Sequence, residues 1–376
     1  MSEQKNKPLG LYVHIPFCAR KCAYCDFASW SGRQADIPRY IDALRAEIAA
    51  RAEDCGHPAA DTVFFGGGTP SLLPPDAYRA IARALRDSFD IAPDAEWTVE
   101  CNPGTLTAAF ADALAESGCS RLSMGMQAAQ PRLLQSLGRI HTPEDAAAAV
   151  RIARAAGIGN LNLDLMLGLP GQTAGDMAET LAAALALSPQ HLSCYALIVE
   201  EGTPLAARVA RGEATLPGED ADREMYGLCR DTLQKRGFHQ YEISNFALPG
   251  RECRHNVNCW KREDYLGFGC AAHSLYADTR RANPRGLDGY LEGDPPETER
   301  IGPEEAMFET MMLGLRLTRG VSESDFEARY GARLWDVYGA RLAPALRDGR
   351  LLRRDGYVRL TERGMDVMNS VLLLIL

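Results

Sequence analysis

Three cysteines stand close together near the start of the chain, in the stretch LYVHIPFCARKCAYCDF. They are Cys18, Cys22 and Cys25, and their spacing is C-x3-C-x2-C. A cubane of four irons and four sulfides takes four ligands, so three thiolates at this spacing can hold three of its irons. The spacing therefore predicts a [4Fe–4S] cluster whose fourth iron is open to an exchangeable ligand.

Two simpler interpretations compete with the cluster. One is a structural zinc site with His14 as the fourth ligand, and the other is three ordinary free thiols. Zinc sites favour two cysteine pairs that lie far apart in the sequence, and no second pair occurs here. The aromatic Tyr24 directly before the last cysteine adds specificity, so the cluster is the preferred interpretation.

A run of three glycines, followed by Thr69 and Pro70, comes directly after an apolar segment that reads TVFF. Glycines in this position let backbone amides and carbonyls approach a ligand closely. A tight turn would explain the run equally well if it stood alone. Because it follows the cysteine loop and a predicted strand, we interpret Gly67, Gly68 and Thr69 as part of a binding site.

Polar residues also stand at or near the ends of later apolar segments. Glu100 closes the strand-like run in VECNPG, where its carboxylate could accept hydrogen bonds from ribose hydroxyls. Asp164 lies inside the apolar run NLNLDLMLGLP, and a charged side chain there needs a partner. Arg139, in LGRIH, is a candidate partner, and Gln127 closes the run MGMQ.

These motifs together resemble the radical S-adenosylmethionine (SAM) proteins over about residues 9 to 175. The lead-in YVHIPFC is similar to one branch, which contains the oxygen-independent coproporphyrinogen III oxidases and the HemW-type heme chaperones. The resemblance implies that the open iron binds SAM. It also implies SAM-binding roles for Tyr12, Gly67, Gly68, Thr69, Glu100, Gln127, Arg139 and Asp164.

Two features distinguish the chaperones from the oxidases within this branch. The oxidases carry a further cysteine two residues after the third, where this chain has Phe27. The chaperones carry an H-N-x-x-Y-W motif linked with heme, and this chain reads His255-Asn-Val-Asn-Cys259-Trp. His255 and Cys259 are therefore the candidate heme residues, with His273 as a second candidate imidazole. We also expect Trp260, Tyr265 and Phe268 to form an apolar rim with His255.

The leading functional hypothesis is a heme chaperone that binds heme and transfers it to acceptor proteins. The alternative is a coproporphyrinogen III oxidase, which decarboxylates propionates by SAM-dependent hydrogen abstraction. A radical SAM enzyme with another substrate is a weaker third idea. The resemblance implies three bound groups, which are the [4Fe–4S] cluster, SAM and heme. It also implies an electron donor for the cluster.

The composition narrows the class of protein. The chain has 376 residues, a formal net charge of −9 and eleven cysteines. The acidic balance argues against a general nucleic-acid binder. Unpaired cysteines, a polar start without an apolar leader and the lack of an apolar run of about 18 residues favour a cytoplasmic protein without a membrane span. The apolar ending VLLLIL permits packing on a partner, including a homodimer.

Strand-like and helix-like segments alternate through the first two-thirds of the chain. We expect strands at 9–15, 62–68, 96–103, 121–127, 160–170 and 191–200. We expect helices at 37–53, 75–90, 107–117, 131–137, 142–156, 173–187 and 220–236. Such alternation predicts a parallel sheet with right-handed crossovers. The candidate residues fall at carboxyl ends of strands, so we favour a partial six-stranded (β/α)6 TIM-like barrel, the fold that the resemblance also implies.

The rest of the chain divides into two further parts. We expect residues 1–240 to form the barrel and residues 241–300 to form loops over its mouth. Residues 301–376 should form a small, mainly helical, winged-helix-like domain. Its β-hairpin, LLRRDGYVRL, should turn at Asp355 and Gly356, with a final helix near Thr361.

Overall fold

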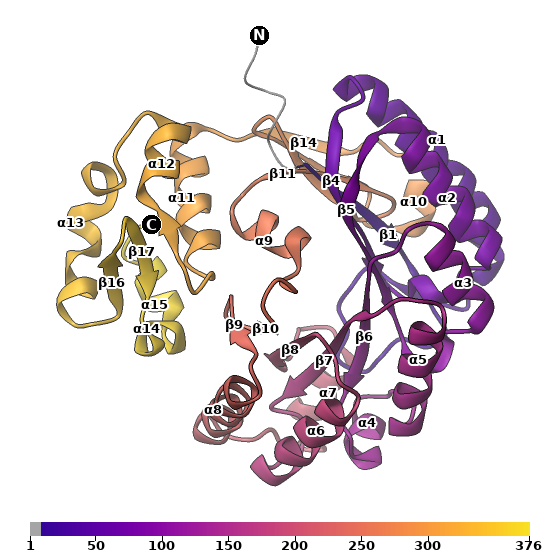
Figure 1. Ribbon diagram of the computed structural model, residues 1–376, viewed down its shortest axis with the longest axis horizontal. Coiled ribbons are helices and arrows are strands. Elements are labelled where there is room, and N and C mark those ends of the chain that lie inside the picture. The colour runs from indigo at the N-terminus through magenta and orange to yellow at the C-terminus, as the bar shows by residue number, and fades with distance from the viewer. Residues whose placement is uncertain (1–8) are drawn as a thin grey trace.

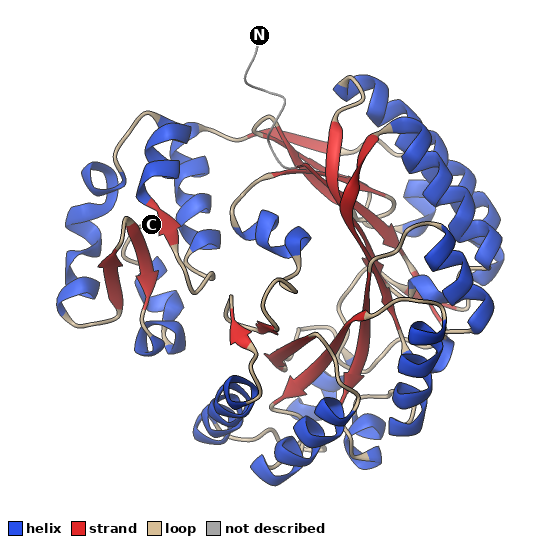
Figure 2. Ribbon diagram, viewed as in Figure 1, coloured by secondary structure: helices blue, strands red, loops and turns tan. Residues whose placement is uncertain are grey.

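A curved twelve-stranded sheet forms the centre of the computed structural model, which describes residues 9–376 (Figure 1). The polar start at 1–8, where the sequence predicts no leader, lies outside the described residues. Helices cover the outer face of the sheet, and a smaller unit made by the last part of the chain lies opposite its inner face (Figures 1 and 2).

Six neighbouring parallel strands carry the predicted barrel. In spatial order they are β1 (Leu9–Ile15), β4 (Ala59–Gly67), β5 (Asp90–Cys101), β6 (Arg121–Gln127), β7 (Asn160–Leu167) and β8 (His191–Ala196). Outside them lie α1 (Ile37–Cys55), α2 (Pro75–Ser88), α3 (Ala108–Glu116), α4 (Pro131–Ser136), α5 (Pro143–Ala155), α6 (Ala174–Ala186), α7 (Pro204–Ala210) and α8 (Glu219–Lys235). The predicted partial barrel is therefore confirmed.

Local sequence explains why these elements begin and end where they do. Thr142 and Thr173 each accept a hydrogen bond from the backbone of the first helical turn and complete capping boxes for α5 and α6. Gly56 ends α1 in the left-handed conformation. Strand β6 is buried along its whole length, as expected for a parallel strand with both faces covered.

The expectation that residues 241–300 form loops is wrong. Within this part, β11 pairs in parallel with β1, and further antiparallel strands extend the sheet beyond it. On the opposite edge, two short strands follow β8. The elements are β9 (His239–Gln240), β10 (Asn245–Ala247), α9 (Arg254–Trp260), β11 (Asp264–Phe268), β12 (His273–Tyr276), β13 (Thr279–Ala282), α10 (Leu287–Glu292) and β14 (Glu297–Arg300).

The last part of the chain has its own apolar core, which includes buried residues from Met311 to Ile375. Its elements are α11 (Pro303–Gly314), β15 (Val321–Ser322), α12 (Glu323–Tyr330), α13 (Leu334–Arg347), β16 (Leu351–Arg354), β17 (Tyr357–Leu360), α14 (Glu362–Asp366) and α15 (Met368–Leu372). The hairpin turns at Asp355 and Gly356, as predicted, and both have positive φ. The separate core supports a domain boundary near 301, which stays a prediction.

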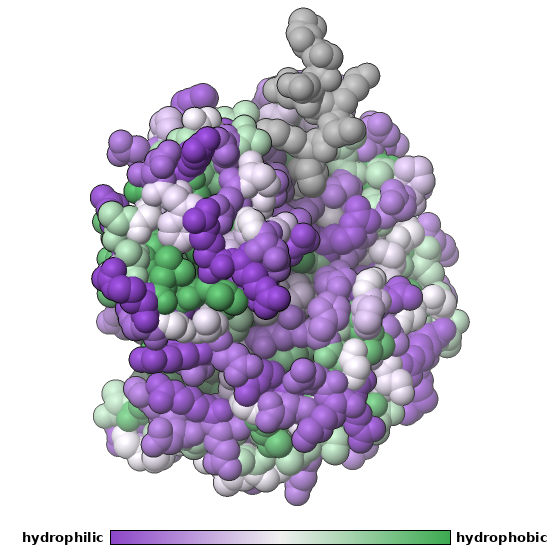
Figure 3. All heavy atoms as spheres, turned by 60° about the vertical axis from the view of Figure 1, so that its left-hand side comes forward, coloured by the Kyte–Doolittle hydropathy of each residue, from purple (hydrophilic) through white to green (hydrophobic). Residues whose placement is uncertain are grey.

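The surface of this small unit carries several exposed apolar side chains, which are Val337, Leu352, Leu373 and Leu376. Figure 3 shows a hydrophobic area on the side of the molecule where this unit lies. Val371 and Ile375 instead point into the core, so the apolar ending packs partly on its own domain. Across residues 9–376, no helix combines the length and apolarity that crossing a bilayer requires.

Candidate cluster and cofactor site

A cavity of about 540 Å³ lies inside the barrel and extends from the cysteine loop to Trp260 and Arg316. We call it the barrel cavity. All three cysteines of the loop line it, together with most of the residues that the sequence assigns to SAM, which are Gly67, Gly68, Thr69, Glu100, Gln127, Arg139 and Asp164. The structure therefore brings these residues, which are far apart in sequence, to one space.

The cysteine loop is fixed to the barrel at several points. Cys18 ends β2 (Phe17–Cys18), which pairs with β3 (Trp30–Ser31) on the far side of the loop. In the middle of the loop, the Ala23 amide donates to the Leu137 carbonyl at 2.9 Å, and the Ala23 carbonyl accepts from the Leu205 amide at 2.8 Å. These contacts hold the three thiols on one side of the barrel mouth.

The donor set fits a cluster better than the zinc alternative. A zinc site would need His14, but its Nε2 contacts the Ala28 carbonyl at 2.8 Å and its Nδ1 contacts the Tyr12 hydroxyl at 3.0 Å. Among the described residues, no three His, Cys, Asp or Glu side chains converge closely enough to hold a single metal ion. A cubane does not require such convergence, because each thiolate binds a different iron.

The glycine run is built for close approach. Gly67 has φ +106°, and a Cβ there would lie 2.5 Å from His14 Cε1. A Cβ on Gly68 would lie 2.7 Å from the Phe17 carbonyl oxygen. Any side chain at either position would displace the cysteine loop or His14, so glycine is required. Thr69 continues the site, and its hydroxyl donates to Cys18 Sγ at 3.7 Å.

Two carboxyl groups, of Glu100 and Asp164, line the barrel cavity together with the glycine run. Burial, with a smaller contribution from Asp164, raises the pKa of Glu100 to about 8. Burial also raises the pKa of Asp164, although its Oδ1 accepts a hydrogen bond from Asn162 Nδ2 at 2.7 Å. A buried carboxyl in this state can exchange a proton when a hydroxyl-bearing or cationic ligand enters.

Arg139 reaches the same space from the other side. Its Nη1 donates to Asn102 Oδ1 at 2.7 Å, and Asn102 Nδ2 donates to Thr69 Oγ1 at 2.9 Å. Arg139 Nε is buried and has no partner among residues 9–376. Gly125 leaves room for the guanidinium, since a Cβ there would lie 2.7 Å from Arg139 Nη2. The space around Arg139 in the barrel cavity therefore suits a hydrogen-bonding group of a bound ligand.

Sequence reasoning assigned no role to Asn102 or Tyr195. Asn102 stands in the quoted motif VECNPG, so a signal for it was present. Tyr195 donates its hydroxyl to Gln127 Oε1 at 3.2 Å. Gln127 itself has φ +65°, next to an irregularity in the pairing of β6 with β7. A non-glycine residue held in this conformation is typical of a functional site.

The two candidate heme residues on α9 lie away from the cysteine loop. His255 is 5% exposed, its Nδ1 contacts Thr62 Oγ1 at 2.9 Å, and burial lowers its pKa to about 4. Burial raises the pKa of Cys259 to about 11. The expected rim is not formed, because Phe268 is fully buried in the sheet core and Tyr265 faces another cavity.

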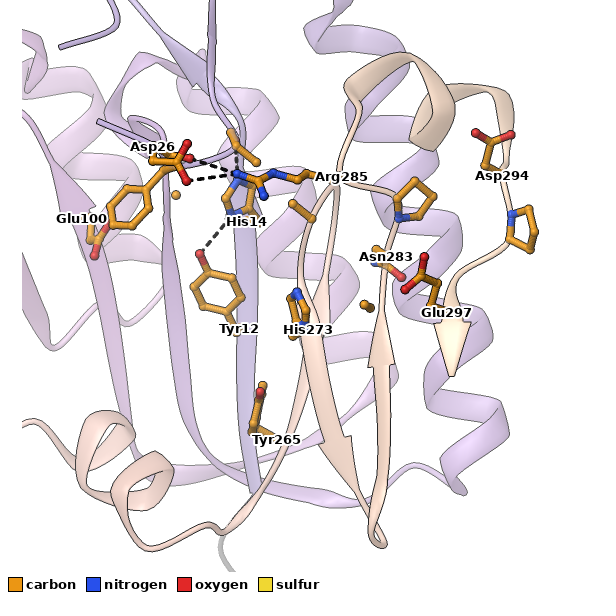
Figure 4. Close-up of a pocket in the computed structure, with 17 residues that line it drawn as sticks. Tyr12, His14, Asp26, Glu100, Tyr265, His273, Asn283, Arg285, Asp294 and Glu297 are labelled. Carbon is orange, nitrogen blue, oxygen red and sulfur yellow. Dashed lines mark hydrogen bonds and ion pairs between the residues drawn. The ribbon is translucent and has the colours of Figure 1, made fainter. Parts of the chain in front are cut away.

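That second cavity, which we call the lateral cavity, has a volume of about 920 Å³ and adjoins the barrel cavity at Phe27, Gly67 and Glu100. Tyr12, Tyr265 and His273 line it from β1, β11 and β12 (Figure 4). His273 is exposed, and Arg285 at one end pairs with Asp26 at 3.1 Å. The cavity thus offers aromatic surface, one accessible imidazole and an arginine that is paired with Asp26, and Asp294 and Glu297 also line it.

Comparison with known proteins identifies the family. The Radical SAM superfamily model matches residues 12–184, and the HemN C-terminal domain model matches residues 301–367. The heme chaperone HemW of Bacillus subtilis is 36% identical over an alignment of 370 positions that covers 96% of this chain and 97% of that protein. The chain belongs to the HemW heme chaperone family of radical SAM proteins.

Other similar proteins agree with this assignment. HemW of Escherichia coli K12 is 35% identical over 384 residues, which cover 99% of each chain. The solved structure of the E. coli coproporphyrinogen III oxidase HemN, a radical SAM enzyme, matches with a TM-score of 0.85. It is 24% identical and the match covers all of this chain and 91% of HemN, so it shows the shared fold alone. Membership of the radical SAM superfamily implies a [4Fe–4S] cluster and SAM.

Proposed function

We propose that this protein holds SAM on a [4Fe–4S] cluster, binds heme beside that site, and passes the heme to acceptor proteins. The observation that carries the proposal is the 35–36% identity to HemW heme chaperones over almost the whole chain. The barrel cavity supports it, because the proposed ligands of cluster and SAM all line one space or its edge. Candidate heme acceptors for a transfer experiment are hemoproteins in their apo forms, either purified or present in a cell lysate.

Cys18, Cys22 and Cys25 would hold the cluster. When bound, the cluster would supply an open iron, which the amino and carboxylate groups of SAM can chelate, and a route for one electron to the sulfonium. The residues of the chain position and shelter that chemistry. Gly67 and Gly68 line the barrel cavity, where their backbone would bind the methionine amino group, and the Thr69 hydroxyl donates to Cys18 Sγ. Delivery of that electron would also require an external electron donor.

The remaining residues orient the nucleoside and the methionine chain. Glu100 accepts hydrogen bonds from the ribose hydroxyls after it loses its proton, and Arg139, whose side chain lines the barrel cavity, donates to the methionine end. Gln127, fixed by Tyr195, and Asp164, fixed by Asn162, limit where the adenosyl group can lie. Tyr12 contacts His14 at 3.0 Å and lines the lateral cavity, so it would border the SAM site rather than lie in it.

The choice among the candidate heme ligands depends on how accessible each side chain is. His255 and Cys259 are the candidates from the sequence motif. His255 is buried and would have to leave its position before it could bind iron, whereas Cys259 is half-buried and burial raises the pKa of its thiol to about 11. His273 needs no such movement, because its side chain is exposed on the wall of the lateral cavity (Figure 4). A cavity of about 920 Å³ falls within the size range of small-molecule sites, roughly 300–1,000 Å³. We therefore propose that heme lies in the lateral cavity with His273 on its iron.

A heme titration of the cluster-loaded protein tests this function. The wild type should shift the Soret band of added heme, and His273→Ala should weaken binding about 10-fold or more by removing the axial ligand. His255→Ala and Cys259→Ala should retain the shift as long as circular dichroism shows that they are folded. Loss of the shift in either α9 variant, with His273→Ala unaffected, would place heme at α9. No shift in the wild type would contradict heme binding.

A further inference from the structure

Arg121 is a buried arginine without an anionic partner. It is the first residue of β6, it is 2% exposed, and its side chain lines the barrel cavity. Among residues 9–376, no carboxylate oxygen lies within 4.0 Å of its guanidinium, and its buried Nε makes no hydrogen bond. An arginine does not lose its proton in a protein, so this charge persists inside the barrel.

The acidic groups closest to Arg121 are already engaged. Glu96 accepts hydrogen bonds from the backbone amides of Arg254 and His255, both at 3.0 Å, and so caps α9. Asp164 accepts from Asn162. Neither carboxylate is free to turn toward the guanidinium without breaking these bonds.

The neutral polar groups nearby are also satisfied by one another. Asn162 donates to Ser123 and Asp164, each at 2.7 Å, and its Oδ1 accepts from His191 Nδ1 at 2.6 Å and from Ser193 at 3.2 Å. The other ring nitrogen of His191 contacts the Tyr241 hydroxyl at 2.8 Å. With this network closed, Arg121 is left as an unused donor facing the cavity.

This donor lies far from the cysteine loop. Arg121 begins and Gln127 ends the seven-residue strand β6, so their separation along the strand is roughly 20 Å at about 3.3 Å per residue. A methionine carboxylate chelated at the cluster is therefore at the other end of the barrel from Arg121. We call the part of the barrel cavity near the start of β6 its lower half. A second cationic side chain, Arg316, also lines this half and stacks on Trp260, with its Cζ 4.4 Å from the ring centroid.

We propose that Arg121 binds the carboxylate of a small molecule in the lower half of the barrel cavity, separate from the cluster. A planar guanidinium matches a carboxylate in two parallel hydrogen bonds. A single negative charge suits the site better than a doubly charged phosphate, because Asp164, Glu96 and Glu242 stand around it. Either a porphyrin propionate or the carboxylate of another SAM molecule has this chemistry. The porphyrin source rests on the proposed function, and it requires the propionate of a heme in the lateral cavity to enter the barrel cavity where the two cavities adjoin at Glu100.

The test measures binding to anaerobically reconstituted protein with three probes, which are SAM, iron protoporphyrin IX and its dimethyl ester. Arg121→Met removes the charge at similar length, and Arg121→Lys keeps the charge without the planar fork. Arg83→Met, on the exposed face of α2, is the matched control. If the site holds a propionate, Arg121→Met should weaken the binding of iron protoporphyrin IX, the free-acid probe, about 10-fold or more. The ester should bind the wild type no better than the free acid binds Arg121→Met.

The outcomes separate this proposal from the proposed function. If SAM binding falls in Arg121→Met while both porphyrins are unchanged, the site holds a SAM carboxylate. If the wild type binds no porphyrin, heme binding fails, and the SAM titration still tests Arg121. If Arg121→Met does not fold, Arg121→Lys should show a smaller loss of the same probe. Equal binding of all three probes by the wild type and the folded Arg121 variants would overturn the site.

Discussion

The ring of Phe64 stacks on the imidazole of His255, with centroids 5.1 Å apart and an angle of 29° between the planes. Phe64 belongs to β4 and faces the barrel cavity, so the contact places His255 inside the barrel. The imidazole also covers Gly10 near the start of β1. The histidine of the HNVNCW motif therefore connects α9 with the two strands β1 and β4 and contributes to folding.

This burial makes stability depend on pH. The folded-state pKa of His255, about 4, lies below its ordinary value near 6.5, so the unfolded chain binds the proton first. The free energy of unfolding should be highest above about pH 6.5 and fall toward pH 4, by about 3 kcal/mol at most. His255→Gln should reduce this decline in urea unfolding curves, and exposed His57→Asn should not. Part of the decline should remain in His255→Gln, because burial also lowers the pKa of His14, His141 and His191. An unchanged decline in His255→Gln would contradict the assignment.

Glu100→Gln tests the ribose contact. In the wild type the carboxyl with pKa of about 8 must release a proton to bind SAM as an anion. SAM affinity should therefore rise with pH through about 8 and level off above it. Glu100→Gln should bind SAM about 10-fold more weakly and lose the pH dependence, whereas exposed Glu53→Gln should match the wild type. Anaerobic calorimetric titrations across this pH range give both quantities. Parallel profiles for wild type and Glu100→Gln would argue against this role.

The cysteine loop predicts the metal content. Anaerobic reconstitution should give about four irons per chain, and replacing Cys18, Cys22 and Cys25 by alanine should abolish iron binding. Cys55→Ala, on α1, is the control and should keep the full iron content. Iron and sulfide analysis with absorption spectra measures the result. A wild-type protein that carries a single zinc, or a triple variant that keeps its cluster, would refute the assignment.

A buried ion pair joins the extended sheet to the C-terminal unit. Arg262, before β11, donates to Glu309 of α11 at 2.7 Å, and the two side chains are 4% and 10% exposed. Glu309→Gln removes one of the two carboxylates that pair with the buried guanidinium, and Asp278 at 2.9 Å remains. We therefore expect a loss of about 2 kcal/mol in unfolding free energy. Exposed Glu299→Gln should cost less than about 0.5 kcal/mol. Equal stabilities would show that the pair does not hold the two parts together.

The barrel and its cofactor residues could be predicted because their signals are local. Each parallel strand is a short apolar run followed by an amphipathic helix, and Gly67, Glu100 and Asp164 stand at or near strand ends within recognisable motifs. The helix α7 also had a signal, because Thr203 caps it and Pro204 is its first residue. That signal was overlooked in an irregular stretch.

The sheet extension and the buried arginine depend on contacts between distant residues. Strand β11 has five residues, and its partner β1 lies about 250 positions earlier, so no local pattern specifies the pairing. The loop interpretation followed from the many Gly and Asn residues there. Arg121 looks like the polar first residue of a strand, and only the folded sheet shows that its charge is enclosed and unpaired.

The measurement that tests the central claim most directly offers the cluster-loaded protein heme and coproporphyrinogen III together, without oxygen and with SAM and an electron donor. Phe27 stands where the oxidases have a further cysteine, and it can neither bind iron nor donate a hydrogen bond. We expect a shifted Soret band from bound heme and no conversion of coproporphyrinogen. SAM-dependent formation of protoporphyrinogen, without heme binding, would contradict the chaperone function and establish the oxidase instead.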